Sequence, residues 1–297
     1  MARINQNIVI PDNTKLEKSY EFINSEITSI NFGNLVQISA DYVFAHCDHI
    51  SELDIPTETI ISGSAVFYSL NRLQYLRFGD NITLNGRYLF KDCINLESLA
   101  IGHSSNISGD NCFNGLRNLQ RIQFAPNTTF SGYYLFSECD SIKEVIIPDN
   151  CTINGDFFFR KCPRLERIVI GNNVVIQGKK CFYQCSGVKI ITIGNNVTIS
   201  GLKFMEGCFK NQNVELTVGC DYIGNPIKIP LPIVRINKFQ NVKDTLRYES
   251  KECSISMERF NDESKVIVLG CGHVFLSEPL IEWLKTKKTC AICRQKI

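Results

Sequence analysis

Hydrophobic residues recur along most of this chain with a period of 23 residues. The clearest column is aromatic, and its members are Phe44, Phe67, Phe90, Phe113, Phe136, Phe159 and Phe182, with Met205 in the next place. A second column follows three residues later at Cys47, Leu70, Cys93, Leu116, Cys139, Cys162, Cys185 and Cys208. A repeat at this interval is typical of a solenoid, whose units stack on one another. We interpret these two columns as its core.

Each unit begins with two alternating apolar residues, such as Val145 with Ile147 or Ile168 with Ile170. Alternation with a period of two predicts a half-buried strand. A turn follows, then a second short apolar segment that ends at a repeated glycine such as Gly155. The Phe-x-x-Cys-x-x-Leu segment is expected to close the coil as one tight helical turn. Because no unit can bury its apolar edge alone, stacked units should continue a parallel sheet.

The residues between the buried strand positions should face outward. They include Glu52, Asp54, Tyr75, Arg77, Arg121, Gln123, Glu144, Ile146, Arg167, Val169, Ile190 and Thr192. A mixed surface of this kind, with arginines, one tyrosine and a late apolar strip, favours protein docking. An ordinary solvated sheet face explains the same residues equally well, so both interpretations stay open here.

Changes in the pattern divide the chain into four parts. Residues 1–26 fit a degenerate capping repeat, and residues 27–218 hold the regular units. Residues 219–250 break the period, and Pro226, Pro230 and Pro232 predict an extended linker there. Residues 251–297 have a different pattern, rich in cysteine and histidine ligand spacings.

The repeat region resembles the BspA-like leucine-rich repeat family. Units of that family read roughly as a strand, a Pro-Asn turn, Ile-Gly, Ala-Phe-x-x-Cys and Leu, and residues 27–218 match this order. The resemblance implies a curved binding scaffold without enzymatic chemistry of its own.

The last part of the chain carries four residues with metal-ligand spacing. Cys271 and His273 form a Cys-x-His pair, and Cys290 and Cys293 form a Cys-x-x-Cys pair, with Trp283 between the two pairs. Two such pairs across a short helical segment can close a tetrahedral zinc site. The sequence therefore predicts that these four residues bind zinc.

This part also resembles a RING finger of the ubiquitin-ligase family, in which eight ligands hold two zinc ions. The set for the second ion is complete, but in the set for the first only Cys253 remains. The other three places fall on Ser256, Leu276 and Pro279, so we expect one zinc ion, with Cys253 as a possible extra ligand. A small apolar cluster is expected in place of the first ion, formed by Ile255, Leu276, Pro279 and Leu280.

The resemblance also implies which residues contact a ubiquitin-conjugating enzyme and its bound ubiquitin. These positions correspond to Ile255, Trp283, Ala291 and Arg294. Ala291 stands where the family has a proline, which should weaken the contact. Arg294 stands at the position that donates hydrogen bonds to both the enzyme and ubiquitin, a role suited to a planar guanidinium. Each residue also has a plain interpretation, as core for Ile255 and Trp283 and as surface charge for Arg294.

Composition adds few constraints. The chain has 297 residues, a formal net charge of +2 and 14 cysteines. The charge gives no sign of a nucleic-acid or membrane partner. The first residues lack a long apolar segment, so we expect an intracellular protein, cytoplasmic and not secreted, with reduced cysteines.

Together these patterns predict a leucine-rich repeat solenoid, mainly β, with a parallel sheet and short helical turns, followed by a small α+β zinc domain. The favoured function is a RING-type ubiquitin ligase whose solenoid binds a protein substrate and whose tail recruits a conjugating enzyme, without covalent catalysis. Two alternatives are a non-enzymatic adaptor with a zinc-stapled pseudo-RING and a SUMO ligase of the SP-RING type.

Overall fold

The chain folds into two compact units, Met1–Ile227 and Lys228–Ile297. The computed structural model describes residues 6–208, 215–218, 223–224, 237–238, 251–269, 271–287 and 289–294. Most of the predicted linker lies outside these residues. The domain boundaries that we predicted at residues 26, 218 and 250 stay predictions.

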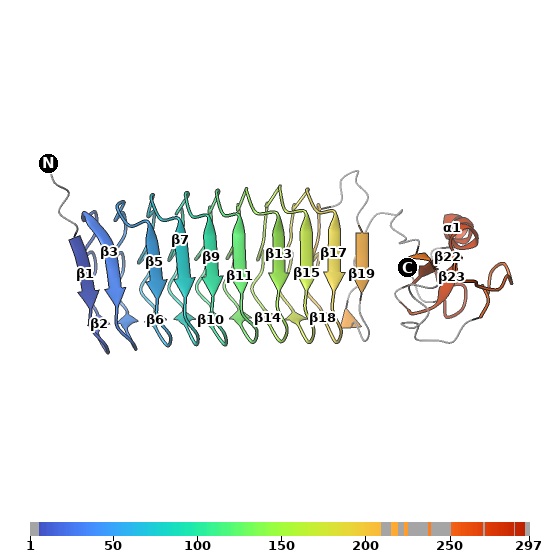
Figure 1. The fold of residues 1–297 in the computed structure, drawn as a ribbon, viewed down its shortest axis with the longest axis horizontal. Coiled ribbons are helices and arrows are strands. Elements are labelled where there is room, and N and C mark those ends of the chain that lie inside the picture. Colours follow the sequence, from blue (N-terminus) through green and yellow to red (C-terminus); the bar gives the residue numbers. More distant parts are fainter. Residues whose placement is uncertain are drawn as a thin grey trace. The chain divides into compact units, whose positions relative to one another are not determined.

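The first unit is a solenoid in which every full coil contributes one long and one short strand (Figure 1). The long strands are β1 (Gln6–Ile10), β3 (Ile27–Phe32), β5 (Glu52–Ile55), β7 (Tyr75–Phe78), β9 (Ser98–Ile101), β11 (Arg121–Phe124), β13 (Glu144–Ile147), β15 (Arg167–Ile170), β17 (Ile190–Ile193) and β19 (Glu215–Val218). The short strands are β2 (Lys15–Leu16), β4 (Gln37–Ile38), β6 (Ile60–Ile61), β8 (Thr83–Leu84), β10 (Asn106–Ile107), β12 (Thr129–Phe130), β14 (Thr152–Ile153), β16 (Val175–Ile176), β18 (Thr198–Ile199) and β20 (Ile223–Gly224).

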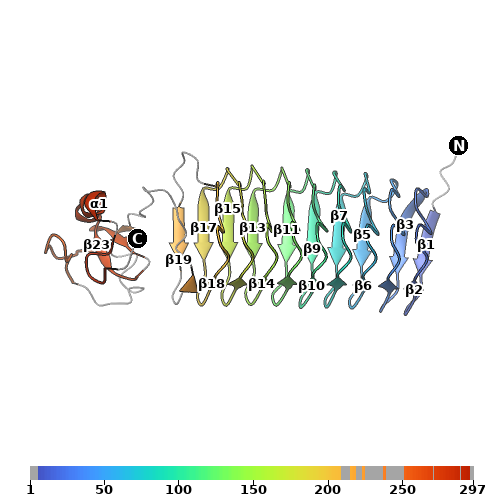
Figure 2. The same ribbon diagram turned by 180° about the vertical axis from the view of Figure 1, so that it is seen from behind.

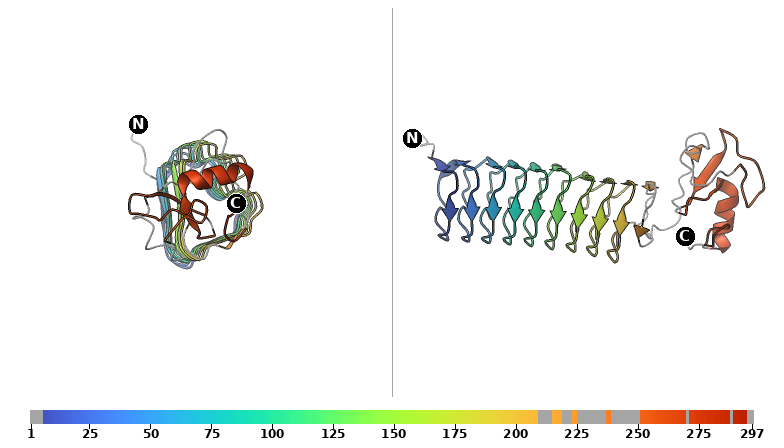
Figure 3. Two further views of the ribbon diagram at one scale, coloured as in Figure 1. Left: turned by 90° about the vertical axis from the view of Figure 1, so that its right-hand side faces the viewer. Right: turned by 90° about the horizontal axis from the view of Figure 1, so that it is seen from below.

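All strands of the solenoid pair in parallel, as the sequence predicts. The ten short strands form one continuous sheet, best seen from behind (Figure 2). The long strands form a pair, β1 and β3, and two four-stranded sheets, β5 to β11 and β13 to β19. Partners are one period apart, as in the pairing of Ile147 with Ile170. The coils therefore superpose when viewed along the array (Figure 3, left panel).

The core is a ladder of phenylalanine rings that follows the predicted aromatic column. Phe136 is fully buried and stacks on Phe113 and on Phe159, with 5.0 Å between ring centroids in both cases. Each stacked pair adds about 0.5–1.5 kcal/mol beyond simple burial. The ladder includes the degenerate first coil, because Phe22 stacks on Phe44 at 5.1 Å.

The segment that contains each core phenylalanine differs in detail from the expected helical turn. Tyr134 and Glu138 have positive φ angles of 56° and 62°, and the segment is a run of turns. Alternate N–H groups therefore point along the solenoid: Tyr134 donates to Asp156, and Phe136 donates to Phe158 at 2.8 Å. A right-handed helical turn would direct these groups within its own coil. The alternation gives each coil a third set of hydrogen bonds to the next one.

The cysteine column is packed core, as expected. The Cys185 thiol is fully buried and donates to the carbonyl oxygen of Phe159 at 3.0 Å. Burial raises the pKa of the Cys93 thiol to about 12. These thiols are thus protonated and inert under ordinary conditions.

The second unit is a small α+β fold. Strands β21 (Asn237–Lys238), β22 (Lys265–Val268) and β23 (Val274–Leu276) form an antiparallel sheet in that order, and helix α1 (Ser277–Thr286) follows β23 directly. No helix in the described part of the chain is long and apolar enough to cross a membrane. Strand β21 lies inside the predicted linker, so part of that segment is structure of the second unit.

Candidate metal centre and contact surface

The structure brings together the four residues predicted to bind zinc. Ligand atoms of Cys271, His273, Cys290 and Cys293 all lie within 4.8 Å of one another. The Nδ1 atom of His273 is 3.3 Å from the Cys271 sulfur and 3.6 Å from the Cys290 sulfur. Zinc bonds of ~2.3 Å to sulfur and ~2.0 Å to nitrogen, at tetrahedral angles, place such atoms roughly 3.5 Å apart. The donor set and its spacing therefore fit a zinc ion.

Two turns place the ligands. The first joins β22 to β23, where Gly272 has a φ of 84° and donates its N–H to the carbonyl of Leu269 at 2.8 Å. The positive φ favours glycine between Cys271 and His273. The second turn follows α1, where the N–H of Arg294 donates to the carbonyl of Cys290 at 3.1 Å.

The ligand set grades from buried to open. Cys290 is fully buried, Cys271 and His273 are half-buried, and Cys293 is exposed. Burial raises the pKa of the Cys271 thiol to about 12, and the neighbouring Cys290 and Cys293 add to the shift. Several thiolates are unfavourable at this spacing without a cation between them. A metal is therefore the natural partner of the deprotonated set.

Trp283 is tied to the metal-binding turn. Its indole Nε1 donates a hydrogen bond to the backbone carbonyl of Thr289 at 2.8 Å. Thr289 directly precedes the buried ligand Cys290. The orientation of the indole thus depends on the turn that carries two of the four ligands.

The four predicted contact residues lie around one apolar cluster of the second unit. The buried members of this cluster are Cys253, Ile267, Leu269, Phe275, Leu280, Leu284 and Cys290. Ile255, Trp283 and Ala291 are partly buried against it, whereas Arg294 is exposed at a φ of 61°. Their roles in binding an enzyme stay a prediction.

Cys253 lies apart from the four ligands. It is fully buried within the apolar cluster, and its sulfur accepts the N–H of Leu276 at 3.4 Å. Leu280 belongs to the same cluster and Ile255 and Leu276 pack against it, so apolar side chains occupy the place of the first metal set. Sequence reasoning missed the larger share of the cluster, which comes from strands β22 and β23. The alternation of Val274, Phe275 and Leu276 beside a short helix was its only signal.

Comparison with known protein families was made over both units. The BspA type leucine rich repeat region matches residues 3–119 and 86–215 in repeated copies. The chain belongs to the BspA-type leucine-rich repeat family. Its C-terminal part matches the Ring finger domain over residues 251–294. The BspA-type solenoid and the RING finger are thus joined in one chain.

The curated relatives match the RING finger region. The chain is 36% identical over 64 residues to "E3 ubiquitin-protein ligase RING1-like" of Arabidopsis thaliana, which is 22% of this chain and 18% of that protein. It is 39% identical over 46 residues to "E3 ubiquitin-protein ligase RNF13" of Homo sapiens, which is 15% of this chain and 12% of that protein. The chain thus spans less than a fifth of the length of these curated relatives.

Among solved structures, the chain is similar to a leucine-rich repeat protein from Bacteroides ovatus. The identity is 20%, the TM-score is 0.47, and 74% of each chain is covered. The T. pallidum leucine-rich repeat protein is 15% identical with a TM-score of 0.37, covering 84% of this chain and 92% of that one.

The BspA-type solenoid presents its outward residues in register. Arg77 lies 3.8 Å from Asp54, and Arg167 lies 3.0 Å from Glu144, in each case across neighbouring coils. Ile146 is 47% exposed on the same face. The face is thus part charged and part apolar, as the sequence predicts.

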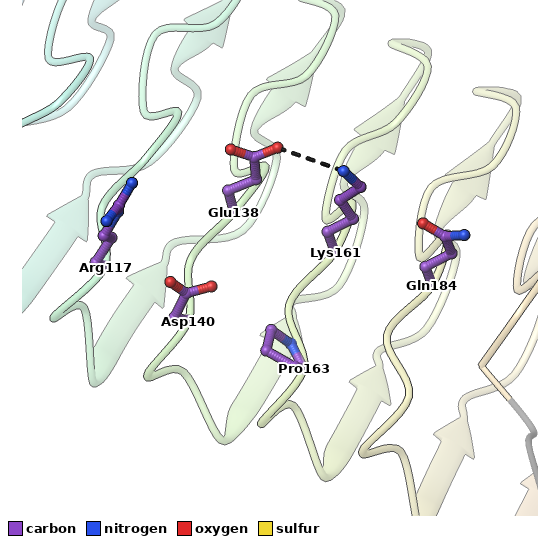
Figure 4. Close-up of a pocket in the computed structure, with 6 residues that line it drawn as sticks. All are labelled: Arg117, Glu138, Asp140, Lys161, Pro163 and Gln184. Atoms are coloured by element: carbon purple, nitrogen blue, oxygen red, sulfur yellow. Dashed lines mark ion pairs between the residues drawn. The ribbon is translucent and has the colours of Figure 1, made fainter.

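On the side of the solenoid formed by the turns there is an open depression of about 420 Å³ (Figure 4). Its lining comes from four successive coils and consists of Arg117, Glu138, Asp140, Lys161, Pro163 and Gln184. Glu138 and Lys161 form an ion pair at 3.9 Å. The lining has no thiol, hydroxyl or imidazole group, so it suits polar contacts and not nucleophilic chemistry.

Proposed function

We propose that this chain is a RING-type E3 ubiquitin-protein ligase. The solenoid binds a protein substrate, and the RING finger recruits a ubiquitin-conjugating enzyme that carries ubiquitin. The proposal includes one zinc ion, held by Cys271, His273, Cys290 and Cys293. A bound zinc ion supplies the cross-link between the two ligand turns and takes no part in the transfer.

One observation carries the proposal. The indole of Trp283 is fixed by Thr289 beside the four-ligand group, at a position that corresponds to an enzyme contact in RING fingers. Ile255 and Ala291 pack against the same cluster, and Arg294 is exposed with its five donors available. The match to a RING finger and the ligase names of the curated relatives support this interpretation.

The proposed mechanism is positioning. Ile255, Trp283 and Ala291 hold the conjugating enzyme, while the Arg294 guanidinium donates hydrogen bonds to both the enzyme and ubiquitin. Restricting the motion of the ubiquitin thioester raises the rate of attack by a substrate amine without a covalent intermediate on this chain. Substrate selection falls to the outward solenoid face, where charged pairs lie beside the apolar Ile146. Thiolate ligands require a reducing compartment, so we place the protein in the cytoplasm.

A discharge assay tests the proposal. The full chain is mixed with a panel of ubiquitin-loaded conjugating enzymes and free lysine, and zinc is quantified on the same sample. We expect faster discharge with about one zinc per chain. Trp283→Ala or Arg294→Ala should remove the acceleration, while Arg259→Ala, which changes an exposed arginine of the same finger, should not.

The main rival is an adaptor without ligase activity. Ala291 in place of the family's proline favours it, because the contact with the enzyme loses apolar surface. One zinc per chain without faster discharge by any enzyme in the panel would establish the adaptor. Discharge that survives Trp283→Ala and Arg294→Ala together would show that the contact residues are assigned wrongly.

A further inference from the structure

Three of the four places of the first metal set meet at one sulfur atom. Cys253 holds the first place, and its Sγ accepts the backbone N–H of Leu276 at 3.4 Å. The N–H groups of Ser256 and Ile255 and the hydroxyl of Ser256 also bond to this sulfur. Ser256 and Leu276 stand where a RING finger with two zinc ions has ligands, so residues that would have bound a metal here bond to a thiol instead.

A metal does not fit at this place. The set offers one sulfur, one hydroxyl, a leucine and a proline, and structural zinc needs four nitrogen or sulfur ligands. The Cys253 sulfur is enclosed by the apolar cluster and lies outside the group formed by the four ligands of the second set. The chain must therefore hold this part of the finger together by other means.

The loop that presents the sulfur is closed by its own backbone. The N–H of Cys253 donates to the carbonyl of Glu258 at 2.8 Å, and the N–H of Met257 donates to the carbonyl of Cys253 at 2.7 Å. An antiparallel bridge joins Glu252 to Arg259 behind them. The turn thus directs N–H groups inward to the sulfur without the help of a metal.

The thiol is tuned to accept these bonds. Burial alone raises the pKa of Cys253, but the hydrogen bonds from Ser256, Ile255 and Leu276 outweigh burial, and the pKa lies below its ordinary value. A sulfur with more thiolate character is the stronger acceptor. The three backbone donors would lose their partner if the sulfur were removed, which is costly at a buried position.

We propose that the Cys253 sulfur replaces the first metal as the group that joins the loop of Ile255 to the start of helix α1. Ile255 is two residues beyond Cys253, and α1, which begins just after Leu276, carries Trp283. One sulfur thus sets the spacing of the two contact positions on either side of the finger. The part of this inference that concerns the conjugating enzyme rests on the proposed function.

The test uses the full chain labelled with ¹⁵N and the substitution Cys253→Ala. We expect the zinc content to stay at that of the wild type, because Cys253 is not a ligand. The amide protons of Ile255, Ser256 and Leu276 should move upfield and exchange with solvent about tenfold faster or more. The indole N–H of Trp283 should keep its shift. Discharge of ubiquitin should fall to about a tenth of the wild-type rate, since the contact positions lose their spacing.

Two further variants keep the test decisive. Cys253→Ser retains an acceptor and should restore part of the protection of the three amides. Leu284→Ala opens a cavity in the same cluster without touching the sulfur, and should leave the three amides near their wild-type shifts. Loss of zinc from Cys253→Ala would overturn the proposal, as would equal amide changes in Leu284→Ala. If the wild type discharges no ubiquitin while the amides behave as expected, the ligase function fails and the sulfur bridge stands.

Discussion

Removal of the metal should unfold the RING finger and leave the solenoid intact. A structural zinc site contributes roughly 10–16 kcal/mol, which is as much as the whole stability of an ordinary domain, about 5–15 kcal/mol. The apolar cluster of the finger has seven buried members, two of them cysteines, so it cannot offset that loss. The solenoid has no part in this balance, because its ladder of phenylalanine rings does not depend on the four ligands.

The single tryptophan of the chain provides the assay. Trp283 lies in the finger, partly buried and bonded to Thr289 beside the ligand Cys290. A high-affinity chelator should shift the tryptophan emission to the red in step with zinc release. The far-UV circular dichroism of the solenoid sheets should persist. Cys290→Ser should show the red-shifted emission before any chelator is added.

Two results would refute this reasoning. Zinc release without a change in emission would show that the turn after α1 keeps its shape without a metal. Loss of the β signal together with the finger would show that the solenoid is not an independent folding unit.

Three other predictions concern stability and metal affinity. Phe136→Ala should lower the unfolding free energy of the solenoid by about 3–5 kcal/mol in urea, because the ring is buried between two others. Tyr133→Ala, at a half-exposed ring, should change it by less than about 0.5 kcal/mol. Gly132→Ala should cost about 1–3 kcal/mol in the same assay, since the added Cβ collides with the Gly109 carbonyl; an unchanged midpoint would contradict this. Burial raises the pKa of Cys271 to about 12, so protons compete with zinc, and chelator competition should show affinity falling about tenfold per pH unit for each displaced proton as the pH decreases.

The solenoid could be predicted because its period fixes almost everything. A constant step of 23 residues places identical positions in register, so the buried columns and the parallel pairing follow from the sequence alone. The form of the phenylalanine segment could not be predicted in this way. Its N–H groups bond to the next coil and not within the segment, as from Phe136 to Phe158, and a local pattern carries no information on that choice.

In the finger, the spacing of Cys271, His273, Cys290 and Cys293 was sufficient to bring the ligands together. The loss of the first metal set was also visible, because Leu276 and Pro279 cannot ligate. What replaces that metal was predicted only in part. The apolar packing was expected, but the hydrogen bonds to Cys253 come from backbone groups, which look the same in every sequence.

The repeated pairing of each coil with its neighbours has a consequence for how such chains change in length. Inserting or deleting one whole coil shifts all that follows by one strand spacing, about 4.8 Å, and leaves every buried contact type as it was. An insertion of any other size breaks the alignment of Phe113, Phe136 and their equivalents. The solenoid is therefore a ruler that evolution can lengthen or shorten only by whole marks. The pattern of charges on its outward face can be recombined in the same steps.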